Sequence, residues 1–227
     1  MKTLISVLGG QLPQLVMFDL DGTLIDSIPD LAVATDHMLV QLGRKPAGQD
    51  KVRNWVGNGL PVLVRRALAD NFDHQDVSEE LEAQALDIFA QVYGSGSSLT
   101  RLYPGVLDTL VSLQKLGIKM ALVTNKPEKF LPKLLAETQM ADFFDWVVGG
   151  DTFAQKKPDP TGLLWVMQQA GVAAEQCLFV GDSRNDVQAA HAAKVACVAV
   201  TYGYNYGQPI SAEKPALIVG DLRELFL

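Results

Sequence analysis

The chain has 227 residues, 48% of them hydrophobic and 20% charged, and its formal net charge is −7. This length suits one domain, or one domain that carries a sizeable insertion, and the hydrophobic share is ample for a full core. The acidic balance argues against a nucleic-acid partner, which would require a basic patch, and no apolar run is long enough to cross a membrane.

The cysteines and the N-terminal segment favour a cytoplasmic protein. Cys177 and Cys197 lie in apolar runs without paired spacing, so we expect them to be small buried residues in a reducing compartment. Residues 1–8 are faintly apolar, but Gly9 and Gly10 interrupt them and no small-residue cleavage site follows. We interpret this segment as an N-terminal extension and not as a signal peptide.

The first predicted strand, residues 15–18, is a continuous apolar run that leads directly into Asp19-Leu20-Asp21-Gly22-Thr23. Such a run is typical of a strand buried on both faces, as in a parallel sheet. Open α/β folds bind their ligands at the carboxyl ends of these strands. Two carboxylates at that place are costly unless a cation or a reaction requires them.

Residues 26–100 show helical periodicity and no strand signal. Helices are predicted over 29–42, 50–56, 61–69 and 79–93, and Gly94-Ser95-Gly96 is expected to close the last one. We therefore predict an all-helical domain, residues 26–100, inserted directly after the first strand of a core domain formed by residues 1–25 and 101–227.

Beyond residue 100, strands alternate with helices. Strands are predicted over 118–123, 146–148, 177–180, 196–200 and 216–219, and helices over 106–116, 130–137, 161–170 and 187–193. This alternation predicts an α/β fold with a doubly wound parallel sheet.

Polar residues follow four of these strands, and parallel strands bring their carboxyl ends to one edge of the sheet. The residues that we expect to meet in one crevice are Asp19, Asp21, Thr124, Asn125, Lys157, Asp182 and Asp186. Several carboxylates cannot all stay ionised there without a cation, and oxygen ligands without His or thiolate favour Mg²⁺. A lysine and a hydroxyl donor suit a phosphoryl group, and a spare carboxylate can act as nucleophile or as acid/base.

The residues at these four strand ends, in this order along the chain, resemble the four motifs of the haloacid dehalogenase superfamily. The helical insertion resembles the helical cap of that superfamily. Within it the chain is most similar to the bacterial phosphoglycolate phosphatases. The supporting stretches are Trp55-Val56-Gly57-Asn58-Gly59, Val123-Thr124-Asn125-Lys126-Pro127, Gly181-Asp182-Ser183-Arg184-Asn185-Asp186 and Thr201-Tyr202-Gly203-Tyr204-Asn205-Tyr206-Gly207.

The resemblance implies a role for each motif residue. Asp19 would take the phosphoryl group as an aspartyl-phosphate, and Asp21 would protonate the leaving group and then deprotonate the attacking water. The Asp19 carboxylate, the backbone carbonyl of Asp21 and Asp182 would hold Mg²⁺, with Asp186 as a supporting residue or an additional ligand. The phosphoryl oxygens would be bound by Thr124, the amide of Asn125 and Lys157.

Three residues of the predicted cap are weaker candidates for substrate binding. Turn chemistry alone explains Gly57-Asn58-Gly59, but Asn58 or the backbone at Gly59 could meet the substrate. Arg66 is a solvated charge by default and, as the alternative, a group that binds a substrate carboxylate. The alternating tyrosines 202, 204 and 206 are interpreted as a loop that packs on the core.

The expected activity is Mg²⁺-dependent hydrolysis of a small phosphorylated metabolite, with 2-phosphoglycolate as the leading substrate. The alternatives are another capped phosphohydrolase or a phosphomutase, acting on a sugar phosphate, pyrophosphate or nucleotide, and a phospho-accepting signalling module. The Asp-x-Asp spacing and the length oppose the last of these. The presence of Asp21 argues against a dehalogenase, because a halide leaving group does not need to be protonated. The only cap lysines, Lys45 and Lys51, lie in no motif of the phosphonatase branch.

Overall fold

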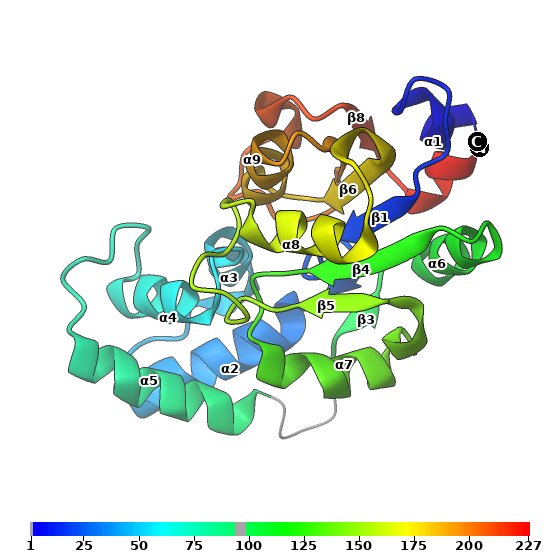
Figure 1. The fold of residues 1–227 in the computed structure, drawn as a ribbon. Helices are drawn as coiled ribbons and strands as arrows, with labels where there is room; N and C mark the ends of the chain where they lie inside the picture. Colours follow the sequence, from blue (N-terminus) through cyan, green and yellow to red (C-terminus); the bar gives the residue numbers. More distant parts are fainter. Residues whose placement is uncertain (1, 94–98) are drawn as a thin grey trace.

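The computed structural model describes residues 2–93 and 99–227. Its main sheet has six parallel strands in the order β5-β4-β1-β6-β7-β8 (Figure 1). Their bounds are Leu15–Phe18 (β1), Lys119–Val123 (β4), Trp146–Val148 (β5), Cys177–Gly181 (β6), Ala196–Val200 (β7) and Leu217–Val219 (β8). The chain builds the sheet outward from β1 in both directions, which confirms the predicted doubly wound α/β fold.

The two faces of the sheet are buried by different helices, because successive side chains of a strand point to opposite faces. Val16 and Phe18 belong to a cluster with α6 (Val106–Lys115) and α7 (Leu131–Glu137). Leu15 and Met17 belong to a second cluster with α8 (Thr161–Ala170) and α9 (Arg184–Ala192). This double burial explains why β1 is a continuous apolar run.

The central position of β1 determines where the site forms. Phe18 pairs with Leu122 of β4 on one side and with Val180 of β6 on the other. The residues that follow these three strands therefore emerge at the same level. The strand order reverses at β1, and this is the place where open α/β sheets bind ligands.

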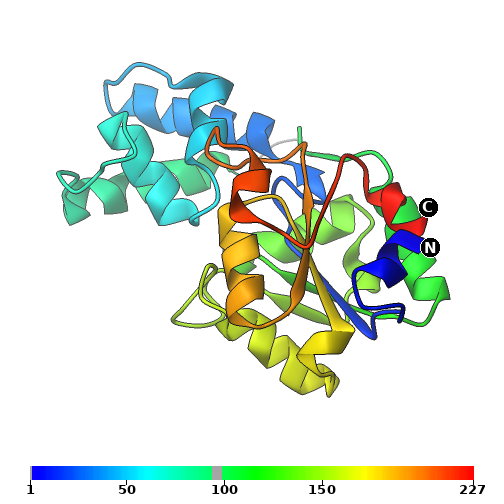
Figure 2. The ribbon, with the colours of Figure 1, turned by 90° about the horizontal axis from the view of Figure 1, so that it is seen from above.

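Four helices follow the first strand, as predicted: α2 (Ile28–Gln41), α3 (Gly48–Trp55), α4 (Leu60–Ala69) and α5 (Glu79–Val92). They share a hydrophobic cluster centred on residues such as Met38, Leu63 and Phe89. Figures 1 and 2 show this helical region to one side of the sheet. Residues 29–93 contain no strand, and the expected closure at Gly94-Ser95-Gly96 lies outside the described residues.

A short antiparallel ribbon, absent from the sequence prediction, connects the helical region to the sheet. It pairs β2 (Ile25–Asp26) with β3 (Arg101–Leu102). Each strand has only two residues, which is too short to give an alternating pattern. The ribbon brings together the two points at which the chain enters and leaves the helical region.

Several ends of elements differ from the prediction by one or two residues, and two elements differ in a further way. Helix α9 begins at Arg184 and not at 187, because Asp186, in the first turn, accepts the backbone N–H of Ser183 at 2.9 Å in a capping box. Predicted helix 130–137 is divided into a 3₁₀ turn, η1 (Glu128–Phe130), followed by α7. The other 3₁₀ turns are η2 (Ala141–Phe143), η3 (Ala174–Gln176), η4 (Ile210–Glu213) and η5 (Leu222–Phe226).

The N-terminal extension contains a short helix, α1 (Lys2–Ser6), that packs beside η5 near the C-terminus (Figure 2). Leu4 is fully buried there, and the backbone N–H of Thr3 donates to the carbonyl of Leu227 at 3.2 Å. None of the helices in the described part of the chain combines the length and the apolarity needed to span a bilayer.

Candidate active site

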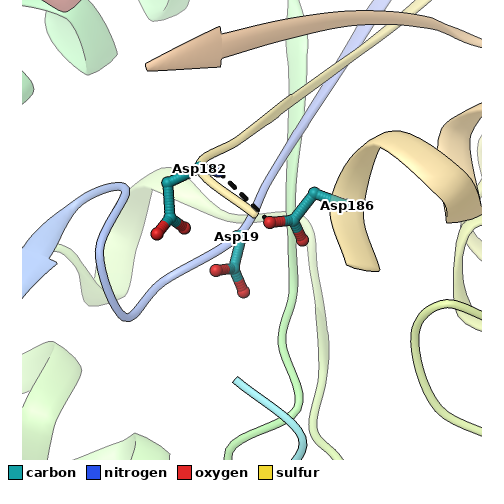
Figure 3. A group of neighbouring side chains, drawn as sticks. All are labelled: Asp19, Asp182 and Asp186. Carbon is teal, nitrogen blue, oxygen red and sulfur yellow. Dashed lines mark hydrogen bonds between the residues drawn. The ribbon is translucent and has the colours of Figure 1, made fainter. Parts of the chain in front are cut away.

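Three buried carboxylates meet at the carboxyl ends of the strands. Asp19 directly follows β1, Asp182 directly follows β6, and Asp186 lies in the first turn of α9. Figure 3 shows the three side chains turned toward one space, and one oxygen from each lies within 4.8 Å of the others. The parallel arrangement has thus produced the predicted carboxylate cluster.

Lys157, in the loop after β5, connects two of these carboxylates. Its ammonium group donates to Asp19 Oδ1 at 2.6 Å and to Asp186 Oδ1 at 2.7 Å, and the side chain is 4% exposed. The neighbouring Lys156 is exposed. The two adjacent lysines therefore differ completely in environment.

The cluster contains more negative charge than Lys157 neutralises. Burial, opposed by the Lys157 charge, raises the pKa of Asp19 to about 6. Burial and the neighbouring Asp186 and Asp19 carboxylates raise the pKa of Asp182 well above its ordinary value. Burial alone would lower the pKa of Lys157, but Asp186 and Asp19 outweigh it and raise that pKa. A cation bound among the carboxylates would relieve this repulsion.

Asp186 uses both of its oxygens within the protein. Oδ1 accepts from Lys157, and Oδ2 accepts the hydroxyl of Ser183 at 2.7 Å and the backbone N–H groups of Ser183 and Asp182 at 2.9 and 3.2 Å. Its contacts therefore fix the loop that carries Asp182 and the position of the Lys157 ammonium group.

Asp182 is oriented by the turn that follows the first strand. Its Oδ1 accepts the Thr23 hydroxyl at 2.9 Å, and its Oδ2 accepts the backbone N–H of Tyr204. Gly22 has a φ of +93°, and a Cβ atom there would lie 2.2 Å from Asp182 Oδ2. Gly22 thus leaves space for Asp182, and Thr23 binds it, which is the physical reason for the Gly-Thr pair of the motif.

Lys126 is a site residue that the sequence prediction did not single out. Its ammonium group donates to both Asp21 oxygens at 3.1 and 3.3 Å and to the Tyr93 hydroxyl at 2.6 Å. Burial alone lowers the pKa of Lys126, but the charge of Asp21 and the contact with Tyr93 outweigh it and raise that pKa. Its position directly after Thr124-Asn125 at a strand end was the available signal.

Thr124 and Asn125 follow β4 and line the same pocket as Asp19. The Asn125 side-chain amide donates to the carbonyls of Lys157 and Gly57 at 2.9 and 2.8 Å. Asn185, from α9, donates to the same Gly57 carbonyl at 2.9 Å. Two asparagines of the sheet region therefore bind one carbonyl of the helical region.

The pocket that contains the carboxylates is also lined by apolar side chains. Its polar lining includes the strand-end residues and Lys126, and Gly59 also lines it. Tyr204 also lines it, so this tyrosine does more than pack on the core as the sequence suggested. The apolar lining includes Leu31, Leu60, Leu63, Phe89 and Phe130.

Two predicted substrate-binding residues lie elsewhere. Asn58 and Arg66 line a second cavity, together with Arg184 and Tyr206. Arg66 Nη1 donates to the backbone carbonyl of Trp55 at 2.7 Å. The described structure therefore brings together all seven predicted strand-end residues and Gly59, but not Asn58 or Arg66.

Known proteins show the same combination of sequence and fold. A phosphoglycolate phosphatase of Pseudomonas putida strain KT2440 is 62% identical over 216 residues, which cover 95% of this chain and 79% of the relative. Phosphoglycolate phosphatase 1 of Pseudomonas aeruginosa PAO1 is 56% identical over 215 residues, with the same coverage. A crystal structure described as a predicted phosphoglycolate phosphatase of Haemophilus somnus 129pt is 36% identical and has a TM-score of 0.87, with 94% of this chain and 96% of that one covered. The sequence model of the haloacid dehalogenase-like hydrolases matches residues 16–200, and this chain belongs to that family.

Proposed function

We propose that this chain is a Mg²⁺-dependent phosphatase that hydrolyses 2-phosphoglycolate to glycolate and phosphate through an aspartyl-phosphate on Asp19. The observation that carries the proposal is the placement of a buried Asp19, bound by Lys157, two residues before the pocket-lining Asp21. The relatives that are 56–62% identical bear the name of this activity. Membership of the haloacid dehalogenase-like hydrolase family supports a hydrolytic reaction.

The donor set fits Mg²⁺. The cluster offers only carboxylate oxygens, which this ion prefers, and its charge exceeds that of Lys157. We assign the metal to the Asp19 carboxylate, the Asp21 backbone carbonyl and Asp182. Asp186, whose Oδ1 binds the Lys157 ammonium group and whose Oδ2 accepts three hydrogen bonds, is proposed as the residue that positions Lys157 and the metal-binding loop. Bound Mg²⁺ supplies positive charge that lessens the repulsion between a carboxylate and a phosphate dianion.

The proposed reaction has two steps. An Asp19 oxygen forms a bond to phosphorus while the bond to the glycolate oxygen breaks, and Asp21 donates a proton to that oxygen. Asp21 then removes a proton from water, whose oxygen attacks phosphorus and releases phosphate, which regenerates Asp19. Lys157, the Thr124 hydroxyl and the backbone N–H of Asn125 bind the phosphoryl oxygens and stabilise their charge in both steps.

Lys126 is the group that we assign to the carboxylate of the substrate. Among the described residues that line the pocket, the lysines are Lys126 and Lys157. Lys157, which binds Asp19, is assigned to the phosphoryl oxygens. Lys126 lies beside Asp21, where the leaving group must sit to receive its proton. A small substrate with a carboxylate next to the ester oxygen places charge at both lysines.

We propose that residues 26–100 form a cap domain on a core domain made of residues 1–25 and 101–227. The β2–β3 ribbon joins them and is the proposed hinge. The apolar pocket walls from α2, α4 and α5 would exclude bulk water when the cap covers Asp19. A comparison of free and substrate-bound protein by small-angle scattering should show a more compact bound form; identical profiles would contradict the hinge.

The test of the activity is the initial rate of phosphate release from 2-phosphoglycolate, with Mg²⁺ and with chelator. We expect turnover that requires Mg²⁺ and that is abolished in Asp19→Asn. Full activity of that variant would overturn the assignment of Asp19. A panel of hexose phosphates, pyrophosphate and nucleotides tests the substrate: comparable rates across the panel, or transfer to a second hydroxyl, would favour another phosphohydrolase or a phosphomutase.

Lys126→Met tests the assignment of the substrate carboxylate. The rate constant kcat/KM for 2-phosphoglycolate should fall by about 10²-fold or more, as expected when a charged hydrogen-bond partner is lost, while an ester without a carboxylate such as p-nitrophenyl phosphate is affected much less. Lys129→Met is the control, because Lys129 does not line the pocket. Equal losses for both esters would contradict this role.

We propose a cytoplasmic location, which both cysteines support because each is buried and free, as in proteins of reducing compartments. Cell fractionation with a periplasmic marker tests it: recovery with that marker would overturn the proposal.

A further inference from the structure

Two arginines from different parts of the chain meet on one aromatic ring. Arg66 comes from α4 of the helical region, and Arg184 is the first residue of α9 in the sheet region. Their guanidinium carbons lie 5.6 and 4.7 Å from the centre of the Tyr206 ring, and Arg66 also lies 5.0 Å from the centre of the Phe72 ring. The stacking orients both groups but does not neutralise their charge.

No carboxylate in the described residues forms an ion pair with either guanidinium group. Arg66 donates Nη1 to a backbone carbonyl, and no hydrogen bond within the described structure uses the side chain of Arg184. The Nε atoms of both are buried without a partner. Burial lowers the pKa of Arg66. The neighbouring Tyr206 opposes this decrease, and the Arg184 charge adds to it. The two like charges thus repel each other across the junction.

The two arginines border a cavity of about 390 Å³ with polar walls. Asn58, Asn185 and Gln208 contribute side-chain amides, and none of the described lining residues is acidic. A water molecule occupies about 30 Å³ of liquid, so the cavity has room for a small organic anion and several waters. Guanidinium forks match the oxygens of carboxylate and phosphate groups, which they bind in pairs.

We propose that this cavity is a second binding site, separate from the catalytic pocket, for a small molecule that carries a phosphate or carboxylate group. The anion neutralises the Arg66–Arg184 pair, and the amides of Asn58 and Gln208 donate to its remaining oxygens. The site is independent of the substrate proposed above, because neither arginine lines the catalytic pocket.

Asn185 connects this site to the catalytic pocket. Its side-chain amide donates to the Tyr206 hydroxyl at 2.8 Å and to the Gly57 carbonyl at 2.9 Å, and Gly57 lines the catalytic pocket. Because one arginine belongs to the helical region and the other to the sheet region, a bound anion favours the arrangement in which the two are in contact.

The experiment is a titration of the Mg²⁺-loaded protein with inorganic phosphate, followed by calorimetry or equilibrium dialysis in 0.15 M salt. We expect two phosphate sites in the wild type. Arg184→Gln and Arg66→Gln should each weaken one site about tenfold or more and keep the other, which also shows that the variants fold. Lys157→Met should weaken the other site instead. Arg223→Gln, an exposed arginine paired with Asp221, removes the same charge elsewhere and should change neither.

A second titration with succinate distinguishes the two chemistries. Succinate that competes for the arginine-dependent site indicates a carboxylate ligand, and a site that accepts only phosphate indicates a phosphorylated one. One phosphate site in the wild type, or two sites that persist in both arginine variants, would overturn the proposal.

Discussion

At the scale of single residues, the site depends on the pairing of buried charges. Lys157 is the cation that joins Asp19 to Asp186, and all three side chains are buried. When one member of such a group is removed, its partners remain buried and uncompensated, which costs several kcal/mol. The same residues therefore determine both stability and chemistry.

Lys157→Met should destabilise the metal-free protein by about 3–5 kcal/mol, because Asp19 and Asp186 lose their shared cation. Urea unfolding followed by circular dichroism measures the change. Lys156→Met is the matched control, since Lys156 is exposed, and its effect should stay within about 0.5 kcal/mol. Equal effects of the two substitutions would show that the Lys157 contacts contribute no stability.

The raised pKa of Asp19 predicts a pH dependence of stability in chelator. Its pKa is about 6 in the folded chain against 3.8 ordinarily, so between these values the folded state binds more protons than the unfolded state. The contribution of Asp19 is therefore greatest below pH 4 and is lost as the pH rises through 6. The stability difference between wild type and Asp19→Asn should fall by about 2 kcal/mol from pH 4 to 7. A difference that is independent of pH would contradict this.

At the scale of elements, the connection between the helical region and the sheet is organised by Tyr204. Its hydroxyl donates to the carboxylate of Asp26 and accepts the backbone N–H of Ser27 at 3.1 Å and the hydroxyl of Tyr103 at 3.3 Å. These partners lie at both ends of the β2–β3 ribbon. Tyr204, in the loop after β7, thus binds both segments that connect the sheet to the helical region.

Tyr204→Phe should cost about 1–2 kcal/mol of stability and should increase hydrogen exchange at residues 25–27 and 101–103, since the ribbon loses this hydroxyl. Mass spectrometry of the exchanged protein resolves these segments. Tyr202→Phe is the control: its hydroxyl donates to the carbonyl of Thr23 at 2.8 Å, outside the ribbon, and should leave exchange there unchanged. Unchanged exchange in Tyr204→Phe would refute the role.

At the scale of the whole molecule, binding of Mg²⁺ and folding should be coupled. The proposed ligands come from β1 and β6, which are separated by more than 150 residues in the chain and meet only in the folded sheet. A cation that binds the folded state alone stabilises it by about 2.7 kcal/mol at a concentration of 100 Kd. The repulsion among the buried carboxylates decreases at the same time.

Mg²⁺ should therefore raise the melting temperature of the wild type in a concentration-dependent manner, and Asp182→Asn should abolish most of this shift. Differential scanning calorimetry with and without chelator measures it. Asp87→Asn removes an equal charge from an exposed position on α5 and should retain the full shift. A shift that persists in Asp182→Asn would exclude Asp182 as a ligand.

The sequence alone determined the parallel sheet, its buried first strand and the meeting of seven polar residues. These follow from local rules: an apolar run predicts a buried strand, and parallel strands bring their ends to one edge. The family resemblance also rests on short contiguous motifs. Capping of α9 by Asp186 is local in the same way, although the structure was needed to show it. The space beside Gly22 is a tertiary feature, because Asp182, which occupies it, lies far away in the chain.

Only the tertiary structure decided which side chains of the helical region meet which parts of the sheet region. Lys126 lies between Asp21 and Tyr93, and Arg66 faces a second cavity with Arg184, because α4 and α5 pack in one particular orientation over the strand ends. No periodicity encodes that orientation. It results from many weak contacts between residues far apart in the chain, together with the bonds from two asparagines to the Gly57 carbonyl.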